Sequence, residues 1–77
     1  MDFYDWLMLN YYGTNGLIGK VAEIAHNSGA FPRDADYQTT RSFFSAKGFS
    51  DAGLKVFENC WKMFTAYEEI RRLETTI

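Results

Sequence analysis

The stretch GTNGLIGKV, from Gly13 to Val21, has the residue types of a phosphate-binding loop, in which glycines bring backbone N–H groups to a phosphate ahead of a lysine. A P-loop places four residues between its first glycine and a Gly-Lys pair, and a serine or threonine follows to hold magnesium. Here five residues separate Gly13 from Gly19, and Val21 takes the place of the hydroxyl. The stretch also follows a predicted helix, whereas a P-loop follows a strand. We interpret it as a helix end, a turn and a new helix in which Gly19 allows another backbone to pack closely.

Glu23 and His26 have the i, i+3 spacing found in carboxylate-bridged di-iron bundles. Such sites need a second pair of this kind and further glutamates on facing helices, and this chain has a single histidine. A dimer would bring two such pairs together. The favoured interpretation is a solvated His26 near a helix C-terminus, where the helix dipole stabilises a positive charge.

The remaining nucleophiles and acids are also incomplete as catalytic sets. Cys60 lies within an apolar helical stripe, which predicts an inert core residue rather than a nucleophile with His26 as its base. Ser42 and Ser45 lack a second histidine or a lysine base, and the adjacent carboxylates of Glu68-Glu69 point in different directions on a helix. The residues therefore predict no enzymatic activity, no metal site, no cofactor and no small-molecule substrate.

Four helices are expected to position these residues, each preceded by a polar side chain that can accept hydrogen bonds from the first backbone N–H groups. The predicted elements are Phe3–Tyr12 capped by Asp2 and ended by Gly13, a second helix to Asn27 capped by Thr14 or Asn15, a third to Lys47-Gly48 opened by Asp34 or Asp36, and a fourth to about Glu74 capped by Ser50. The fourth helix has apolar residues at steps of three and four, which is typical of one buried stripe. They are Leu54, Phe57, Cys60, Trp61, Phe64 and Tyr67.

The length and composition predict one small, soluble, aromatic-rich domain. The chain has 77 residues, with seven Phe, five Tyr and two Trp to fill a core. A net charge of −2, with acids and bases mixed, gives no long-range attraction to nucleic acid or anionic lipid. A single cysteine, no secretory signal and no run of about 20 apolar residues together favour a cytoplasmic location without membrane contact.

Five aromatic and apolar motifs follow one another along the chain. They are Phe3-Tyr4-x-Trp6-Leu7, Val21-Ala22-x-Ile24, Phe31-Pro32, Asp36-Tyr37 with Phe43-Phe44, and Val56-Phe57-Glu58-x-x-Trp61-x-x-Phe64. In this order and spacing they resemble the YozE-type SAM-like family of small proteins from Gram-positive bacteria and their phages. The resemblance implies an all-α fold, a four- to five-helix bundle like the sterile alpha motif with a long C-terminal helix, and no established enzymatic role. It covers about Phe3 to Tyr67, which divides the chain into a SAM-like domain at 1–67 and a C-terminal helix extension at 68–77.

The chain departs from that family in its charge. The family is usually more acidic after the second helix's apolar pair and near the Phe-Pro turn, whereas this chain has His26-Asn27-Ser28-Gly29 there. We therefore carry over no role of an acidic surface.

The C-terminal extension offers the clearest place for a partner. A helix from Asp51 to Glu74 would be roughly 36 Å long, whereas a domain of this size is about 30 Å across. Its end is expected to overhang the body and to carry an apolar stripe at Ala66, Ile70, Leu73 and Ile77. The alternative is that the last turn frays and Ile77 is a disordered end.

These observations predict a non-enzymatic interaction module that binds another protein or a second copy of itself. A stripe of this kind seldom persists without a use. The predicted partner-binding residues include three from the first helix, provided that the helix leaves them exposed. The full set is Met8, Tyr11, Tyr12, Ile70, Leu73 and Ile77.

Nucleic-acid binding is the competing hypothesis. Basic side chains of the third and fourth helices could form a patch that contacts phosphates. They are Arg41, Lys47, Lys55, Lys62, Arg71 and Arg72. The eight basic residues are offset by ten acidic ones, and Glu58/Lys62 and Glu68/Arg72 have the spacing of ordinary i, i+4 ion pairs on a solvated face.

Overall fold

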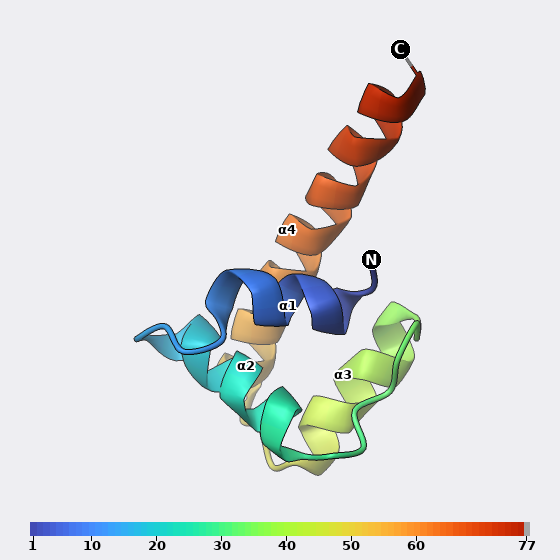
Figure 1. Cartoon of the computed structure of the whole chain (residues 1–77). Helices are drawn as coiled ribbons and strands as arrows, with labels where there is room; N and C mark the ends of the chain where they lie inside the picture. Colours follow the sequence, from blue (N-terminus) through green and yellow to red (C-terminus); the bar gives the residue numbers. More distant parts are fainter. Residues whose placement is uncertain (77) are drawn as a thin grey trace.

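The computed structural model describes residues 1–76, which form four helices and no strand (Figure 1). The helices are α1 (Phe3–Tyr11), α2 (Leu17–Asn27), α3 (Tyr37–Ala46) and α4 (Asp51–Thr76). The first three helices and the N-terminal part of α4 form one body, and α4 contacts each of the other three. The rest of α4 extends away from this body, so that the molecule measures 42 × 26 × 23 Å. The predicted all-α bundle with a long C-terminal helix is confirmed.

Three of the predicted helix caps are present. The side chain of Asp2 accepts a hydrogen bond of 2.9 Å from the backbone N–H of Asp5 at the start of α1. Asp36, one of the two alternatives for α3, accepts one of 2.8 Å from the N–H of Thr39. The hydroxyl of Ser50 accepts one of 3.2 Å from the N–H of Gly53 in the first turn of α4. These bonds satisfy N–H groups that have no partner within their own helix.

The predicted cap of α2 is wrong. The N-cap position is Gly16, which offers no side-chain hydrogen bond. Thr14 turns back instead, and its hydroxyl donates to the carbonyl of Tyr11 at 2.7 Å, so it satisfies the end of α1 rather than the start of α2. Helix α1 ends at Tyr11, one residue before the expected Tyr12, and α4 continues to Thr76, two residues beyond Glu74.

The turn between α1 and α2 also explains Gly19. A Cβ atom at this buried position would lie 2.0 Å from the carbonyl oxygen of Thr14. Only glycine lets the turn approach α2 so closely. The predicted close approach of another backbone at Gly19 is therefore confirmed.

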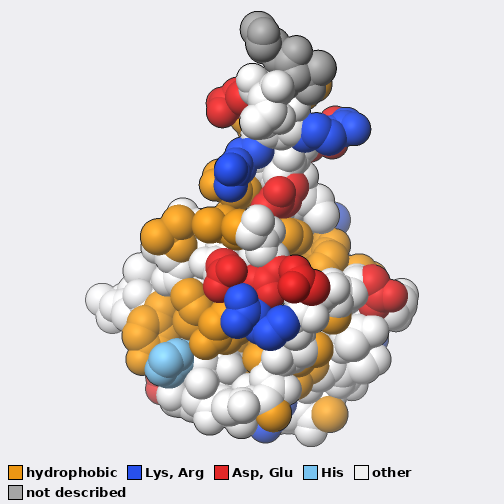
Figure 2. Space-filling view, turned by 45° about the vertical axis from the view of Figure 1, so that its right-hand side comes forward, with side chains coloured by type: hydrophobic (Ala, Val, Ile, Leu, Met, Phe, Trp, Pro, Cys, Tyr) orange, Lys and Arg blue, Asp and Glu red, His pale blue; other side chains and the backbone are white. Residues whose placement is uncertain are grey.

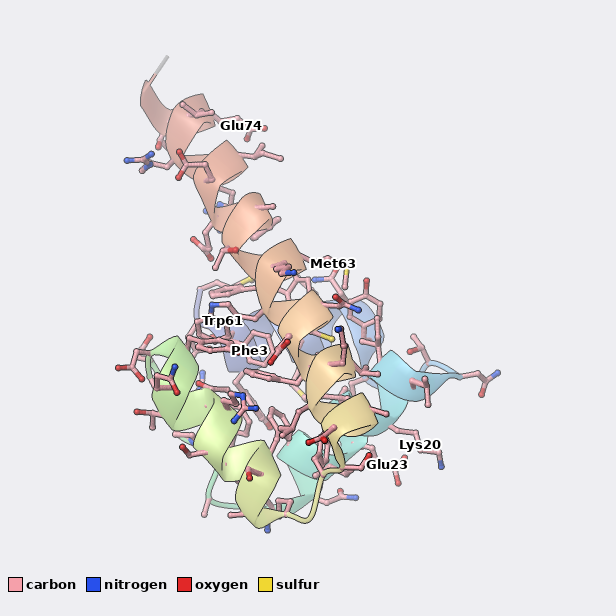
Figure 3. All side chains as sticks on the ribbon, turned by 180° about the vertical axis from the view of Figure 1, so that it is seen from behind. Phe3, Lys20, Glu23, Trp61, Met63 and Glu74 are labelled. Carbon is pink, nitrogen blue, oxygen red and sulfur yellow. The ribbon has the colours of Figure 1, made fainter. Side chains whose placement is uncertain are left out.

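The core joins a cluster of aromatic side chains from α1, α3 and α4 to smaller apolar side chains, among them three of α2. Phe57 is fully buried, and its ring centroid lies 5.8 Å from that of Phe3 and 5.1 Å from that of Phe44. Phe3 also packs on Trp61 with a centroid distance of 5.1 Å, and Figure 3 shows these two rings between α1 and α4. The buried hydroxyl of Thr40 donates to the carbonyl of Asp36 at 2.8 Å, so this polar group has a partner.

An ion-pair cluster fastens the start of α1 to the loop before α3. Asp2, whose side chain is 6% exposed, accepts from Arg33 Nε at 2.7 Å, and Arg33 Nη2 donates to Asp5 at 2.8 Å. The N–H of Asp34 donates to Asp2 at 3.1 Å. Burial by itself would raise the pKa of Asp2, but the hydrogen bonds from Arg33 and from the backbone N–H groups of Asp5 and Asp34 outweigh it and lower the pKa to about 2.

We expect Asp2→Asn to lower the free energy of unfolding at pH 7 by about 1–2 kcal/mol. Asparagine still caps a helix, so the loss reports the charge. Because the folded-state pKa of Asp2 lies below its ordinary value of 3.8, the stabilisation is present above pH 4 and disappears as the pH falls towards 2. Urea unfolding followed by circular dichroism across this range checks the prediction. If the free energies of unfolding of variant and wild type differed by the same amount at every pH, the prediction would be wrong. Glu23→Gln, at an exposed residue, is the control.

Candidate interaction surface on helix α4

Cys60 and His26, the pair considered above as a nucleophile and its base, lie in different surroundings. Cys60 is fully buried in the core, as predicted, and burial raises the pKa of its thiol to about 11. The thiol therefore stays protonated and is a poor nucleophile. His26 is exposed at the end of α2, where Nδ1 lies 3.4 Å from the hydroxyl of Tyr4 and the ring lies 4.5 Å from that of Tyr12. Among the described residues, no three His, Cys, Asp or Glu side chains are grouped so that they could hold a metal ion.

The far part of α4 overhangs the body. With 26 residues the helix is about 39 Å long, and Figures 1 and 2 show its C-terminal part standing clear of the other helices. Every side chain from Glu69 to Thr75 is exposed. The structure has α4 helical to Thr76, which supports the overhang over a frayed last turn; Ile77 lies outside the described residues.

An apolar stripe runs along this overhang. Met63, Ala66, Ile70 and Leu73 follow one another at steps of three and four, which places them on one face of α4. We call these four residues the α4 stripe. All four are exposed, with Ile70 at 57%, Leu73 at 55% and Met63 at 37%. The sequence predicted Ala66, Ile70 and Leu73 but not Met63, although Met63 precedes Ile70 by seven residues, the signal that could have found it.

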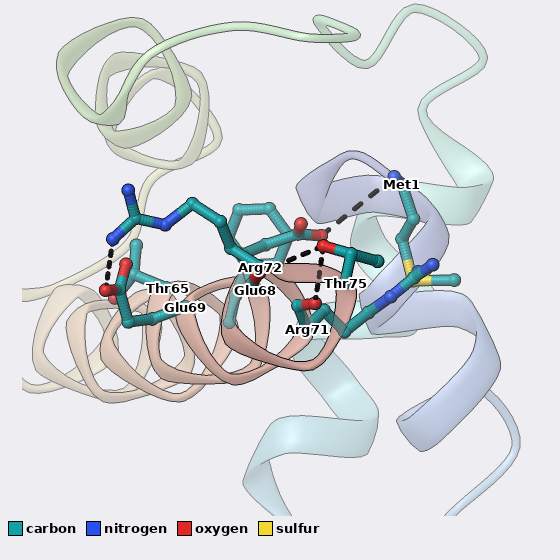
Figure 4. A pocket seen from close by; sticks show the side chains of 8 residues that line it. Met1, Thr65, Glu68, Glu69, Arg71, Arg72 and Thr75 are labelled. Atoms are coloured by element: carbon teal, nitrogen blue, oxygen red, sulfur yellow. Dashed lines mark hydrogen bonds and ion pairs between the residues drawn. The ribbon is translucent and has the colours of Figure 1, made fainter. Parts of the chain in front are cut away.

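The opposite face of α4 is polar and forms an open hollow of about 550 Å³ beside the N-terminus (Figure 4). The N-terminal amine lies 3.9 Å from the carboxylate of Glu68, and Glu69 pairs with Arg72. The hydroxyl of Thr75 donates to the carbonyls of Arg71 and Arg72 at 3.2 and 2.9 Å. Two ion pairs thus join charges on this face of the overhang, and the apolar stripe lies on its other side.

Towards the body, the stripe leads to a groove. Val56 and Asn59 precede Met63 by seven and four residues, so they continue the same face of α4. Here α1 and α2 stand beside α4 and enclose a groove of about 540 Å³. Its lining is Asn10, Tyr11, Thr14, Asn15, Leu17, Ile18, Val56 and Asn59. We call it the α2–α4 groove. Leu17, 70% exposed, lies at its wall.

The comparison with protein families decides the identity of the body. Residues 2–66 match the family described as the YozE SAM-like fold. The chain belongs to this family. Comparisons with curated proteins and with solved structures give no match. Membership of the YozE SAM-like family shows the fold and names no activity. The match ends at residue 66, within α4. Because α4 continues through residue 67 without a break, the division of the chain into 1–67 and 68–77 stays a prediction.

The α1 residues predicted for partner binding are not equally accessible on the YozE SAM-like body. Met8 and Tyr11 are half-buried and pack against the core, and Figure 1 shows α1 crossing α4. The Tyr11 hydroxyl lies 3.9 Å from the sulfur of Met63. Only Tyr12, 48% exposed, meets the condition that the helix leave it exposed. The sequence missed Leu9, which is 72% exposed; in an almost wholly apolar helix, spacing does not separate its two faces.

The basic residues of the nucleic-acid hypothesis do not converge on one patch. Lys47 follows α3 near the start of α4, whereas Arg71 and Arg72 lie near its end, roughly 30 Å away along the helix. Arg41 lies 3.6 Å from the carboxylate of Glu58, and Arg72 pairs with Glu69. Figure 2 shows acidic and basic side chains interleaved on the visible face. The hypothesis stays a prediction, for which exposed Lys55 and Lys62 are the main support.

No helix within residues 1–76 has the length and hydropathy that a membrane span requires.

Proposed function

We propose that this YozE SAM-like protein is a non-enzymatic interaction module that binds another protein chain through the α4 stripe. The observation that carries the proposal is a helix that continues past the body and presents Met63, Ala66, Ile70 and Leu73 on one exposed face. Contiguous exposed apolar surface is typical of interaction sites. Anchors at i, i+3 and i+7 on a helix are a recurring mode of protein recognition.

The surroundings of the stripe also support a protein partner. The wall of the overhang opposite the stripe is polar, and several of its charges pair within the chain. The stripe itself is bordered by Lys62 and Glu69 along one edge, so that it has the composition of a small protein interface with an apolar centre and a polar rim. Phosphate binding would instead need several cations on one surface.

Replacing Ile70 and Leu73 together by serine should weaken partner binding by at least tenfold. Burying one such side chain contributes about 1.5–3 kcal/mol, and about 1.4 kcal/mol changes affinity tenfold. Both side chains are more than half exposed, so the melting temperature should change little. The measurement is capture from a cell lysate on immobilised wild type and variant, with and without nuclease, followed by titration of the captured protein.

The matched control is the double variant Arg71→Ser with Thr75→Ser, on the opposite face of α4. It should bind as the wild type does. Equal binding by wild type and stripe variant, both to themselves and to other proteins, would refute the proposal. Loss of the captured material on nuclease treatment would favour the nucleic-acid hypothesis instead.

A further inference from the structure

We infer that the partner seated on the α4 stripe is a second copy of this chain, packed antiparallel about a two-fold axis that passes α4 near Met63 and Ala66. This inference rests on the proposed function and names its partner. It is carried by three features of the structure: the register of the stripe, the groove beside its lower end, and the charges along one edge.

In the antiparallel register, the apolar residues of the overhang and the residues of the groove lie at equal distances from the two-fold axis. In an antiparallel pair with Met63 of one helix opposite Ala66 of the other, Ile70 lies opposite Asn59 of the second copy, and Leu73 lies opposite Val56. Asn59 and Val56 line the α2–α4 groove. Each overhang therefore reaches the groove of the other copy. Figure 3 shows that Met63 lies where α4 leaves the body and Glu74 near its far end, so the axis falls between groove and overhang.

The groove has the chemistry to receive these anchors. Leu17, Ile18 and Val56 contribute apolar walls, and a smaller hollow of about 240 Å³ that shares Leu17 and Val56 continues along α2. Leu17 is 70% exposed in the single chain. An aliphatic side chain from the second copy would remove both its own surface and that of Leu17 from water.

The charges along the edge of the stripe select the antiparallel direction. Lys62 and Glu69 lie seven residues apart on the same edge of α4. In the antiparallel register Glu69 of one copy lies beside Lys62 of the other, and the two-fold axis repeats this contact. A parallel pair would instead place Glu69 against Glu74 of the second copy, and like charges at such positions oppose pairing. Glu69 already pairs with Arg72 on its own helix, and Lys62 adds a second cation.

The area of the surfaces favours a contact that includes the groove. The overhang beyond Phe64 is about 18 Å of helix, fewer residues than the roughly 20–30 per side of a standard interface. Two overhangs that touched only each other would therefore bury too little. In the two-fold arrangement each copy contributes one stripe and one groove, so the contact is made twice. A head-to-tail arrangement would leave one stripe and one groove open and continue into filaments, whereas the two-fold closes.

The test is analytical ultracentrifugation of the full chain over a range of concentrations. The wild type should sediment as a dimer, about twice the 8.9 kDa chain mass. Lys62→Glu and Glu69→Lys should each weaken the dimer at least tenfold, and the double variant that carries both changes should restore it. Restoration cannot arise from general damage to the fold. Leu17→Asp in the groove should also weaken the dimer, with its helical circular dichroism unchanged.

Lys47→Glu is the matched charge-reversal control, because Lys47 lies after α3 and away from the stripe; it should leave the dimer intact. A wild-type monomer that still captures another protein through Ile70 and Leu73 would overturn this inference and leave the proposed function standing. A dimer insensitive to Leu17→Asp and to both charge reversals would also overturn it. So would single variants whose losses the double variant fails to restore.

Discussion

Replacing Phe57 by alanine should lower the free energy of unfolding by about 3–5 kcal/mol. The ring is fully buried and contacts rings from α1 and α3, so its removal opens a cavity where three helices meet. A chain of this length has a total stability of roughly 4–12 kcal/mol. The variant should therefore be largely unfolded well below the melting temperature of the wild type. Urea unfolding followed by circular dichroism at 222 nm measures the difference.

Leu9→Ala is the control for this loss. It also removes a large apolar side chain from a helix of the body, but Leu9 is 72% exposed. We expect a change within about 0.5 kcal/mol. If the two variants lost similar amounts of stability, the aromatic cluster around Phe57 would not be the main source of stability.

Replacing Gly19 by alanine should destabilise the protein by about 2–3 kcal/mol, although the same change in an open helix stabilises it by about 1 kcal/mol. The new Cβ atom would lie 2.0 Å from the carbonyl oxygen of Thr14, so the turn between α1 and α2 would have to move. That turn also shapes the wall of the α2–α4 groove. Thermal unfolding measures the loss.

Gly53→Ala, also at a helical glycine, provides the comparison for Gly19. A Cβ atom at Gly53 would meet only the ring of Phe49, at 3.2 Å, and a side chain can shift where a backbone carbonyl cannot. We expect a much smaller loss than at Gly19. If Gly19→Ala had a higher melting temperature than the wild type, the turn could move away from the new Cβ atom without loss of stability, and the prediction would be wrong.

The features predicted well from the sequence are those that short-range chemistry determines. Asp2 and Ser50 each precede a helix whose N–H groups they satisfy. Cys60 is in the core because steps of three and four keep one face of α4 against the body. The overhang follows from helix length, since no glycine or proline interrupts α4 after Gly53.

The features that were missed depend on how helices meet in space. Either Thr14 or Asn15 could cap α2 locally, but the turn sends the hydroxyl of Thr14 back to α1. Leu9 and Tyr11 are both apolar residues of one helix, and only the crossing of α1 over α4 decides that Tyr11 is packed and Leu9 exposed. The α2–α4 groove likewise forms where α1 and α2 meet α4, which lies far from them in the sequence, so spacing along the chain could not predict it.

The contacts of Phe3 have a consequence for synthesis on the ribosome. This side chain rests on Phe57, Trp61 and Phe64, which are made 54 or more residues after it. At translation rates of about 5–20 residues per second, the nascent N-terminal helix waits roughly 3–12 s for these partners. Until then its tryptophan and phenylalanine rings are open to chaperones and to other nascent chains, because the core cannot close before this part of α4 is made.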